Sequence, residues 1–143
     1  RQHFAPRMLS QAVQLYRENF QPSEYLEQPY VSMGVPTVVA KTDAEAQHLA
    51  TSAYQRVLGL MRGQSLKLKP PVESMDHIWT PAERISVNNF YALGQIGSPE
   101  TVKAGLQDLL EHVDVDEFIF TCDIYDTEKR LENFSLLMDI KNS

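Results

Sequence analysis

Cysteine is almost absent from this chain of 143 residues, which contains only Cys122. A single cysteine excludes an internal disulfide framework and any metal site built from several cysteines, and it suits a reducing compartment. Long apolar runs are missing too, since no stretch approaches the roughly 18 apolar residues of a membrane span. No basic region followed by an apolar run marks a signal peptide. We therefore expect a cytoplasmic protein.

Positive charge is also scarce. The chain has 13 Lys and Arg against 19 Asp and Glu, a formal net charge of -6, and the two signs are interleaved along the sequence. Sequence-independent binding to nucleic acid needs a basic surface and is not expected here. With 43% hydrophobic and 22% charged residues, the composition is that of a soluble globular domain.

The usual signatures of catalytic and metal sites are missing. The histidines His3, His48, His77 and His112 lack metal-ligand spacing, so no metal site is predicted, and no Ser, His and Asp arrangement is suggested. A small doubly wound domain that binds a nucleotide or a partner is the least favoured reading, because no Gly-rich phosphate loop follows a strand.

Helix and strand patterns alternate along the chain. Capping signals occur at Thr42 with Glu45, at Thr80 with Glu83, and at Ser98. The patterns predict helices over 6–20, 42–60, 80–93, 98–113 and from 127 onwards, with strands over 30–40, 95–97 and 116–122. The strand over 30–40 is apolar without clean alternation, so we expect it to be covered on both faces. This alternation of helices and strands is typical of βαβ units with parallel strands.

A long connection over about 62–80 contains Gly63, Pro70 and Pro71 and has weak periodicity. Loops of this length inside a compact domain often act as lids. His77 and Trp79, near its end, either close over a substrate or pack the loop down, and packing is the favoured interpretation.

Several short sequence motifs, in order along nearly the whole chain, resemble those of the luciferase-like flavin-dependent monooxygenase superfamily. They are HFAP at 3–6, PYV at 29–31, KTDAEA at 41–46, GSPETV at 97–102, Asp116-Glu117, and Ile124-Tyr125-Asp126 with Arg130, Leu131 and Phe134. Each motif alone is common, and the resemblance rests on the order and spacing of the motifs.

The resemblance implies that residues 1–143 form a single incomplete domain, the C-terminal half of a (β/α)8 TIM-type barrel with parallel strands alternating with helices. Such proteins use reduced flavin and oxygen to oxidise a small organic substrate. The implied cofactor is FMN, held largely by upstream strands, so the chain is expected to be inactive by itself. A homo-oligomer without membrane or nucleic-acid partners is expected.

The active site of a (β/α)8 barrel lies beyond the C-terminal ends of its strands. That position nominates Cys122, Asp123 and Tyr125 for the substrate pocket and His3 for a flavin or substrate contact, while Ser98 at a helix start is a second cofactor candidate. Blander alternatives remain: His3 as a frayed terminal residue, Cys122 as an inert buried thiol, and Ser98 as a plain helix cap. No catalytic residue is assigned.

A second hypothesis makes the chain a non-catalytic α/β domain stabilised by self-association. Open edges of a parallel sheet favour pairing with a second copy. A stable dimer would support this hypothesis, whereas a flavin-loaded sample would contradict it.

Overall fold

The computed structural model describes residues 4–64 and 67–143. Its elements are α1 (Phe4–Glu18), β1 (Ser32–Val39), α2 (Asp43–Met61), α3 (Pro81–Phe90), β2 (Gln95–Gly97), α4 (Pro99–His112), β3 (Glu117–Thr121) and α5 (Thr127–Lys141). The predicted order of helices and strands is confirmed. Helix α3 ends earlier than predicted because the chain turns after it, where the N–H of Gly94 donates to the carbonyl of Tyr91 at 2.9 Å.

The helix starts follow the capping signals, with one correction. Thr80 and Glu83 form a complete capping box at α3, and the Ser98 hydroxyl accepts from the backbone N–H of Thr101 at α4. At α2 the Thr42 hydroxyl caps the helix, but the carboxylate of Glu45 pairs with Lys129 at 2.6 Å. That carboxylate links α2 to α5, so the capping box predicted there is only half formed.

The sheet has three parallel strands in the order β2-β1-β3. The pairing of β1 with β3 runs from Ser32 opposite Glu117 to Pro36 opposite Thr121, whereas β2 pairs only with the last three residues of β1. Consecutive strands of a (β/α)8 barrel are neighbours in sequence order. The predicted α/β class with parallel strands is confirmed, and β1 lies between strands that follow it along the chain.

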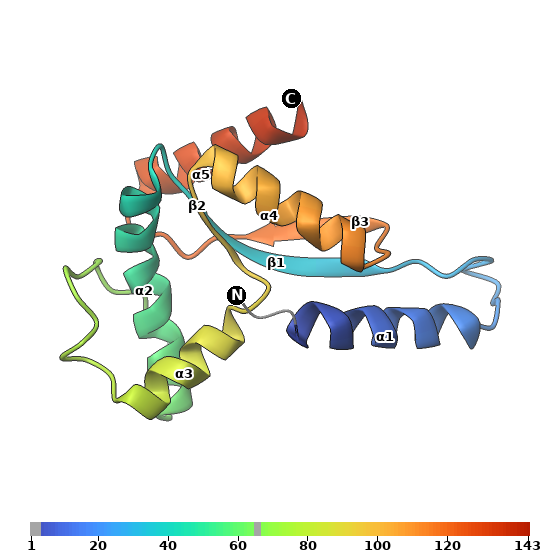
Figure 1. Ribbon diagram of the computed structural model, residues 1–143, viewed down its shortest axis with the longest axis horizontal. Helices are drawn as coiled ribbons and strands as arrows, with labels where there is room; N and C mark the ends of the chain where they lie inside the picture. The colour runs from blue at the N-terminus through green and yellow to red at the C-terminus, as the bar shows by residue number, and fades with distance from the viewer. Residues whose placement is uncertain (1–3, 65–66) are drawn as a thin grey trace.

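Helices cover one face of this sheet. Met33, Val35 and Val39 of β1 are buried against α1, α4 and α5 in a single apolar cluster. Figure 1 shows α4 and α5 together along the sheet, with α1 following its length. Burying large aliphatic side chains in this way contributes about 1.5–3 kcal/mol for each side chain.

The opposite face is covered only where the strands end. Helix α2 packs there on Val38 and Ile96, and Figure 1 shows α2 and α3 grouped at the end of the sheet where β1 leads into α2. Towards the strand starts, Ser32 and Gly34 are exposed and Ile119 keeps 51% of its surface exposed. The expectation that β1 is covered on both faces is therefore wrong for its first half. We call the exposed surface of Ser32, Gly34, Ile119 and Thr121 the open face.

The described part of the connection between α2 and α3 is packed down. Met75 is buried with Val57 and Val87, and the ring of Trp79 lies 5.9 Å from that of Tyr54. Packing, favoured from the sequence for both residues, is confirmed for Trp79 and wrong for His77, which is exposed, while a role of this connection as a lid stays a prediction. No helix in the described ranges is both long and apolar enough to cross a bilayer.

Candidate functional site at the strand ends

The three parallel strands end at the same edge of the sheet, as in folds that bind ligands there. The chain leaves β3 through Cys122, Asp123 and Tyr125, and it leaves β2 at Ser98. The predicted pocket residues therefore lie at this edge. His3 falls outside the described residues.

Asp123 forms an ion pair with Arg56 of α2. The Nε and Nη2 atoms of Arg56 both lie 2.7 Å from Oδ2 of Asp123, and the two side chains are 28% and 36% exposed. The pair fixes α2 to the segment that follows β3. A guanidinium has five N–H donors, and a carboxylate oxygen accepts more than one bond, so this half-exposed pair presents both donors and acceptors.

Tyr91 lies beside this pair. Burial raises the pKa of its phenol to about 12, and the carboxylate of Asp123 acts in the same direction. The hydroxyl donates to the carbonyl of Ala53 at 3.4 Å. A cavity of about 20 Å³ is lined by Tyr91, Asp123, Thr37 and Thr121 among others, which is room for about one water molecule. Tyr91 keeps its proton at neutral pH and suits hydrogen bonding, not proton transfer.

Cys122 and Tyr125 flank Asp123 without joining the pair. Cys122 packs against the cluster of Val38 and Ile124, and burial raises the pKa of its thiol to about 11. Because the thiolate is the nucleophilic form of cysteine, this raised pKa does not favour Cys122 as a nucleophile, and its place in a substrate pocket stays a prediction. Tyr125 is 49% exposed at the surface.

Ser98 faces a carboxylate of the chain itself. Oδ1 of Asp43 accepts from the backbone N–H of Ser98 at 2.7 Å, and this bond lowers the pKa of Asp43. A Cβ atom on Gly97 would come within 2.8 Å of the same oxygen, so the glycine permits this close approach. An anion thus already occupies the N-terminus of α4. The described residues at this helix start do not form a cradle for a flavin phosphate.

Sequence reasoning did not single out Arg56, Tyr91 or Asp43. Arg56 and Asp123 are separated by 67 positions, and no local pattern pairs them. Asp43 has the appearance of an ordinary acidic residue in the first turn of a helix. Only the folding of α2 and α3 at the strand ends brings these side chains to Asp123 and Ser98.

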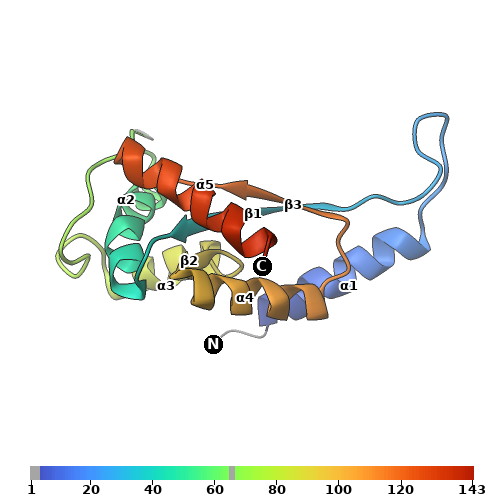
Figure 2. The same ribbon diagram turned by 90° about the horizontal axis from the view of Figure 1, so that it is seen from above.

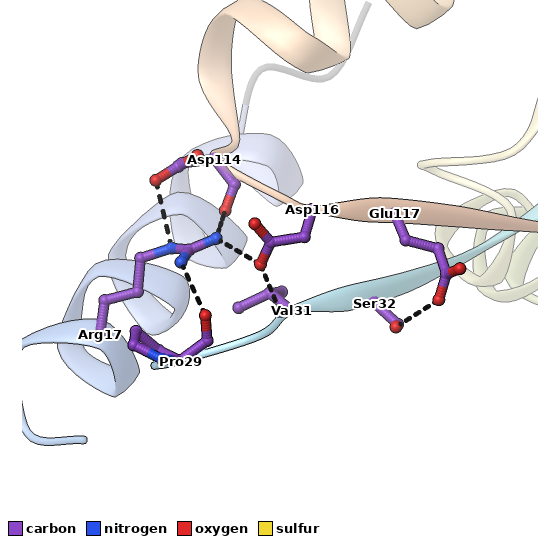
Figure 3. Close-up of polar contacts among 7 residues, drawn as sticks. All are labelled: Arg17, Pro29, Val31, Ser32, Asp114, Asp116 and Glu117. Carbon is purple, nitrogen blue, oxygen red and sulfur yellow. Dashed lines mark hydrogen bonds and ion pairs between the residues drawn. The ribbon is translucent and has the colours of Figure 1, made fainter. Parts of the chain in front are cut away.

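A second polar cluster lies at the opposite edge, where β1 and β3 start (Figure 3). Arg17 of α1 pairs with Asp116 at 3.0 Å and with Asp114 at 3.1 Å, and its guanidinium also donates to the carbonyls of Asp114 and Pro29. The carboxylate of Asp116 in turn accepts from the N–H of Val31 at 2.7 Å. The cluster ties α1 to the starts of both strands.

The bonds in this second cluster explain the state of Asp116. The N–H of Val31, followed by the Arg17 guanidinium, lowers the pKa of the Asp116 carboxyl. All of these bonds join groups of the fold itself, so the cluster stabilises the strand starts. Within the described ranges, no group of three or more His, Cys, Asp or Glu side chains is placed to hold a metal ion.

Comparison with known proteins gives relatives over nearly the whole chain. No family model matches it. The chain is 40% identical over 139 residues to a protein of Escherichia coli (strain K12) named Luciferase-like monooxygenase, which covers 97% of this chain and 42% of that protein. It is 42% identical over 138 residues to the uncharacterized protein YvbT of Bacillus subtilis (strain 168), covering 96% and 41%.

The chain therefore spans about two fifths of the length of the curated relatives that it matches. Among solved structures, the crystal structure of apo-MsnO8 is similar with a TM-score of 0.69 and 21% identity, covering 96% of this chain and 42% of that one. At this level of identity the structural likeness concerns the fold alone.

Proposed function

Because the chain is related to the luciferase-like monooxygenases, we propose that it supplies the C-terminal part of an enzyme that uses reduced flavin and oxygen to oxidise a small organic substrate. The observation that carries this proposal is the 40% identity with the Escherichia coli protein over 97% of the chain. The cofactor proposed is FMN, and the compartment proposed is the cytoplasm.

For the fold, we propose that β1 and β3 are neighbouring strands of a (β/α)8 barrel and that β2, which lies between them in sequence, is not one of its eight strands. Their pairing is the longer one, from Ser32 to Pro36 of β1, and β2 adds only three residues beside the end of β1. In this arrangement α1, α4 and α5 lie outside the barrel and the open face lies inside. The exposure of Gly34 and Ile119 supports the assignment, since both faces of parallel sheets are normally covered.

The proposed role of the strand-end site is to orient a ligand. Arg56, Asp123 and Tyr91 present hydrogen-bond donors and acceptors beside the open face, and Thr121 is exposed next to them. Bound flavin would supply the oxidation chemistry, while the protein orients it and excludes water. Since Asp43 occupies the start of α4, the FMN phosphate would be held by parts of the longer protein outside these residues.

A comparison of two flavins tests this proposal. Purified chain, with its mass verified at 16.3 kDa, is titrated with FMN and with riboflavin while flavin fluorescence is followed. We expect weak binding of similar affinity for both, since they differ in the phosphate, and no substrate oxidation by the chain alone. A strong preference for FMN would place a phosphate site in this chain, and no binding of either flavin would overturn the proposed ligand site.

The second candidate function, a non-catalytic domain stabilised by self-association, is favoured by one observation. Strand β3 forms the edge of the sheet, and its Ile119 is 51% exposed. Apolar edge strands promote pairing with another chain. A stable dimer in size-exclusion chromatography with light scattering, together with no flavin binding, would favour this function.

A further inference from the structure

A groove of about 610 Å³ lies on the helix-covered side of the sheet, away from the strand-end site. Leu106 and Leu110 of α4 line one side of it, Phe134 and Met138 of α5 line the other, and Phe118 and Phe120 belong to β3. Figure 2 shows α5 crossing the strands obliquely, with its last turn beside α4. The volume falls within the usual range of small-molecule sites, about 300–1,000 Å³.

The lining of the groove is unusually exposed for apolar side chains. Leu110 and Met138 each keep 54% of their surface exposed, and Phe134 keeps 43%. The rings of Phe118 and Phe120 lie 5.9 Å apart and are only half-buried. Contiguous apolar surface of this kind, bordered by polar residues, is typical of a binding groove.

The charges around the groove have one sign. Among the described residues, Lys103 and Lys141 are the only charged ones that line it, although the chain as a whole carries 19 acidic residues against 13 basic ones. Lys141 is the last residue of α5, and the Lys103 ammonium donates to the hydroxyl of Ser143 at 2.9 Å. Both cations therefore lie where α5 ends. A lysine in the last turn also stabilises its helix, but this does not account for Lys103 on α4.

From this combination we propose that the groove between α4 and α5 binds an anionic single-chain amphiphile, such as a fatty-acid carboxylate. Its hydrocarbon chain lies along Leu110, Phe134 and Met138, and its head group pairs with Lys103 and Lys141. Charge complementarity selects this occupant over a cationic or neutral one. The site is independent of the proposed flavin chemistry, because it lies on the other side of the sheet from Asp123.

Isothermal titration calorimetry with dodecanoate, kept below its critical micelle concentration, tests the proposal. Dodecyltrimethylammonium has the same hydrocarbon chain with a positive head, and hexanoate has the same head with a shorter chain. We expect dodecanoate to bind about tenfold more tightly than dodecyltrimethylammonium, which loses the head-group pairs, and at least about a hundredfold more tightly than hexanoate, which lacks six methylene groups. Equal binding of the two dodecyl compounds, or no binding of dodecanoate, would overturn the proposal.

Two substitutions on α5 provide a matched pair. Met138→Gln alters the groove, whereas Leu131→Gln alters a residue of the same helix that is 65% exposed and does not line it. Met138→Gln is expected to weaken dodecanoate binding about fivefold, and Leu131→Gln to leave it unchanged. The double variant Lys103→Gln with Lys141→Gln is expected to weaken dodecanoate roughly fivefold and to leave the cationic ligand unaffected.

Light scattering across a range of concentrations separates this proposal from occupation by a second copy. If Met138→Gln dissociates a dimer that Leu131→Gln leaves intact, and dodecanoate does not bind, the groove is an interface and the proposal is wrong. Flavin titrations of the same variants are expected to match the unsubstituted chain. If the unsubstituted chain binds dodecanoate but no flavin, the proposed function is wrong and the groove stands. If Met138→Gln also lowers flavin affinity, the groove is not a separate site and this proposal is wrong.

Discussion

The two ends of the β1–β3 pair are built differently. At the strand starts, the guanidinium of Arg17 binds two carboxylates and two backbone carbonyls of the same chain. At the strand ends, Arg56 meets a single carboxylate oxygen, and its side chain and that of Asp123 stay 28% and 36% exposed. The difference lies in the number of bonds and not in exposure, because Arg17 and Asp116 are 21% and 34% exposed, close to the values of the other pair.

The strand ends also contain a buried hydrogen-bond network. The Asn133 side chain of α5 is fully buried, accepts from the N–H of Val39 at 2.6 Å and donates to the Thr37 hydroxyl. The Thr37 hydroxyl in turn donates to the carbonyl of Thr121. These bonds satisfy the edge of β1 beyond Pro36, where pairing with β3 stops. The strand ends therefore contain both an exposed ion pair and a buried network, and substitutions should separate the two.

Asn133→Ala should have the largest effect on stability. The substitution leaves the N–H of Val39 without its acceptor and opens a cavity, so we expect a loss of about 3 kcal/mol in the free energy of unfolding. Urea denaturation followed by circular dichroism measures it. Ser135→Ala, at an exposed position of the same helix, is the control, and equal losses in the two variants would show that the buried layer is unimportant.

Gly97→Ala should follow in size. A new Cβ would lie 2.7 Å from Cγ2 of Thr101 and 2.8 Å from Oδ1 of Asp43, so the start of α4 must move. We expect a loss of about 2 kcal/mol. Gly34→Ala meets nothing within 4 Å on the open face and should be nearly neutral. Thermal melts of the two variants check the contrast, which fails if Gly34→Ala is the more harmful change.

Arg17→Met should cost about 1–2 kcal/mol, because the carboxylates and carbonyls that it binds lose their donor. The comparison variant is Arg7→Met, an exposed arginine of the same helix, which should leave the denaturation midpoint within error. An Arg17→Met protein as stable as the original would mean that the strand starts are not held by this cluster.

Asp123→Asn should change stability by less than about 1 kcal/mol, since exposed ion pairs contribute little. Its effect should appear in ligand binding, where we expect flavin affinity to fall severalfold. Asp139→Asn, on the exposed surface of α5, serves as the control in both measurements. A large stability loss with unchanged flavin binding would make the Arg56–Asp123 pair structural, like the cluster at the other end.

Acid should weaken both ends through Asp43 and Asp116, which gives the smallest of these effects. The pKa of each carboxyl is lowered in the folded chain. The stability that these two carboxylates contribute is therefore complete above their ordinary pKa of about 3.8. It is lost as the pH falls through the lower pKa values of the folded chain. Denaturation midpoints measured from pH 5 downwards should fall less steeply for Arg17→Met, because Asp116 there loses a stabilising partner. An identical pH dependence would contradict this assignment.

Local patterns predicted most of the fold. Thr80, Ser98 and the apolar stripes located the helices, because caps and periodicity depend on neighbours within one or two turns. The same patterns misjudged β1, since an apolar strand does not reveal that only α2 covers its second face. Asp123 was nominated from its place after a strand. Its partners Arg56 and Tyr91 were missed because they approach it only through the path of α2 and α3.

Nuclear magnetic resonance of ¹⁵N-labelled chain titrated with riboflavin tests most directly whether the strand ends are the ligand side. We expect amide shifts at Thr121, Asp123 and Tyr125 and at Gly34 on the open face, with the amides of Val31 and Asp116 unchanged. The same shifts should appear with FMN. Shifts confined to Val31 and Asp116, or shifts at Ser98 that only FMN produces, would contradict this division between the two ends.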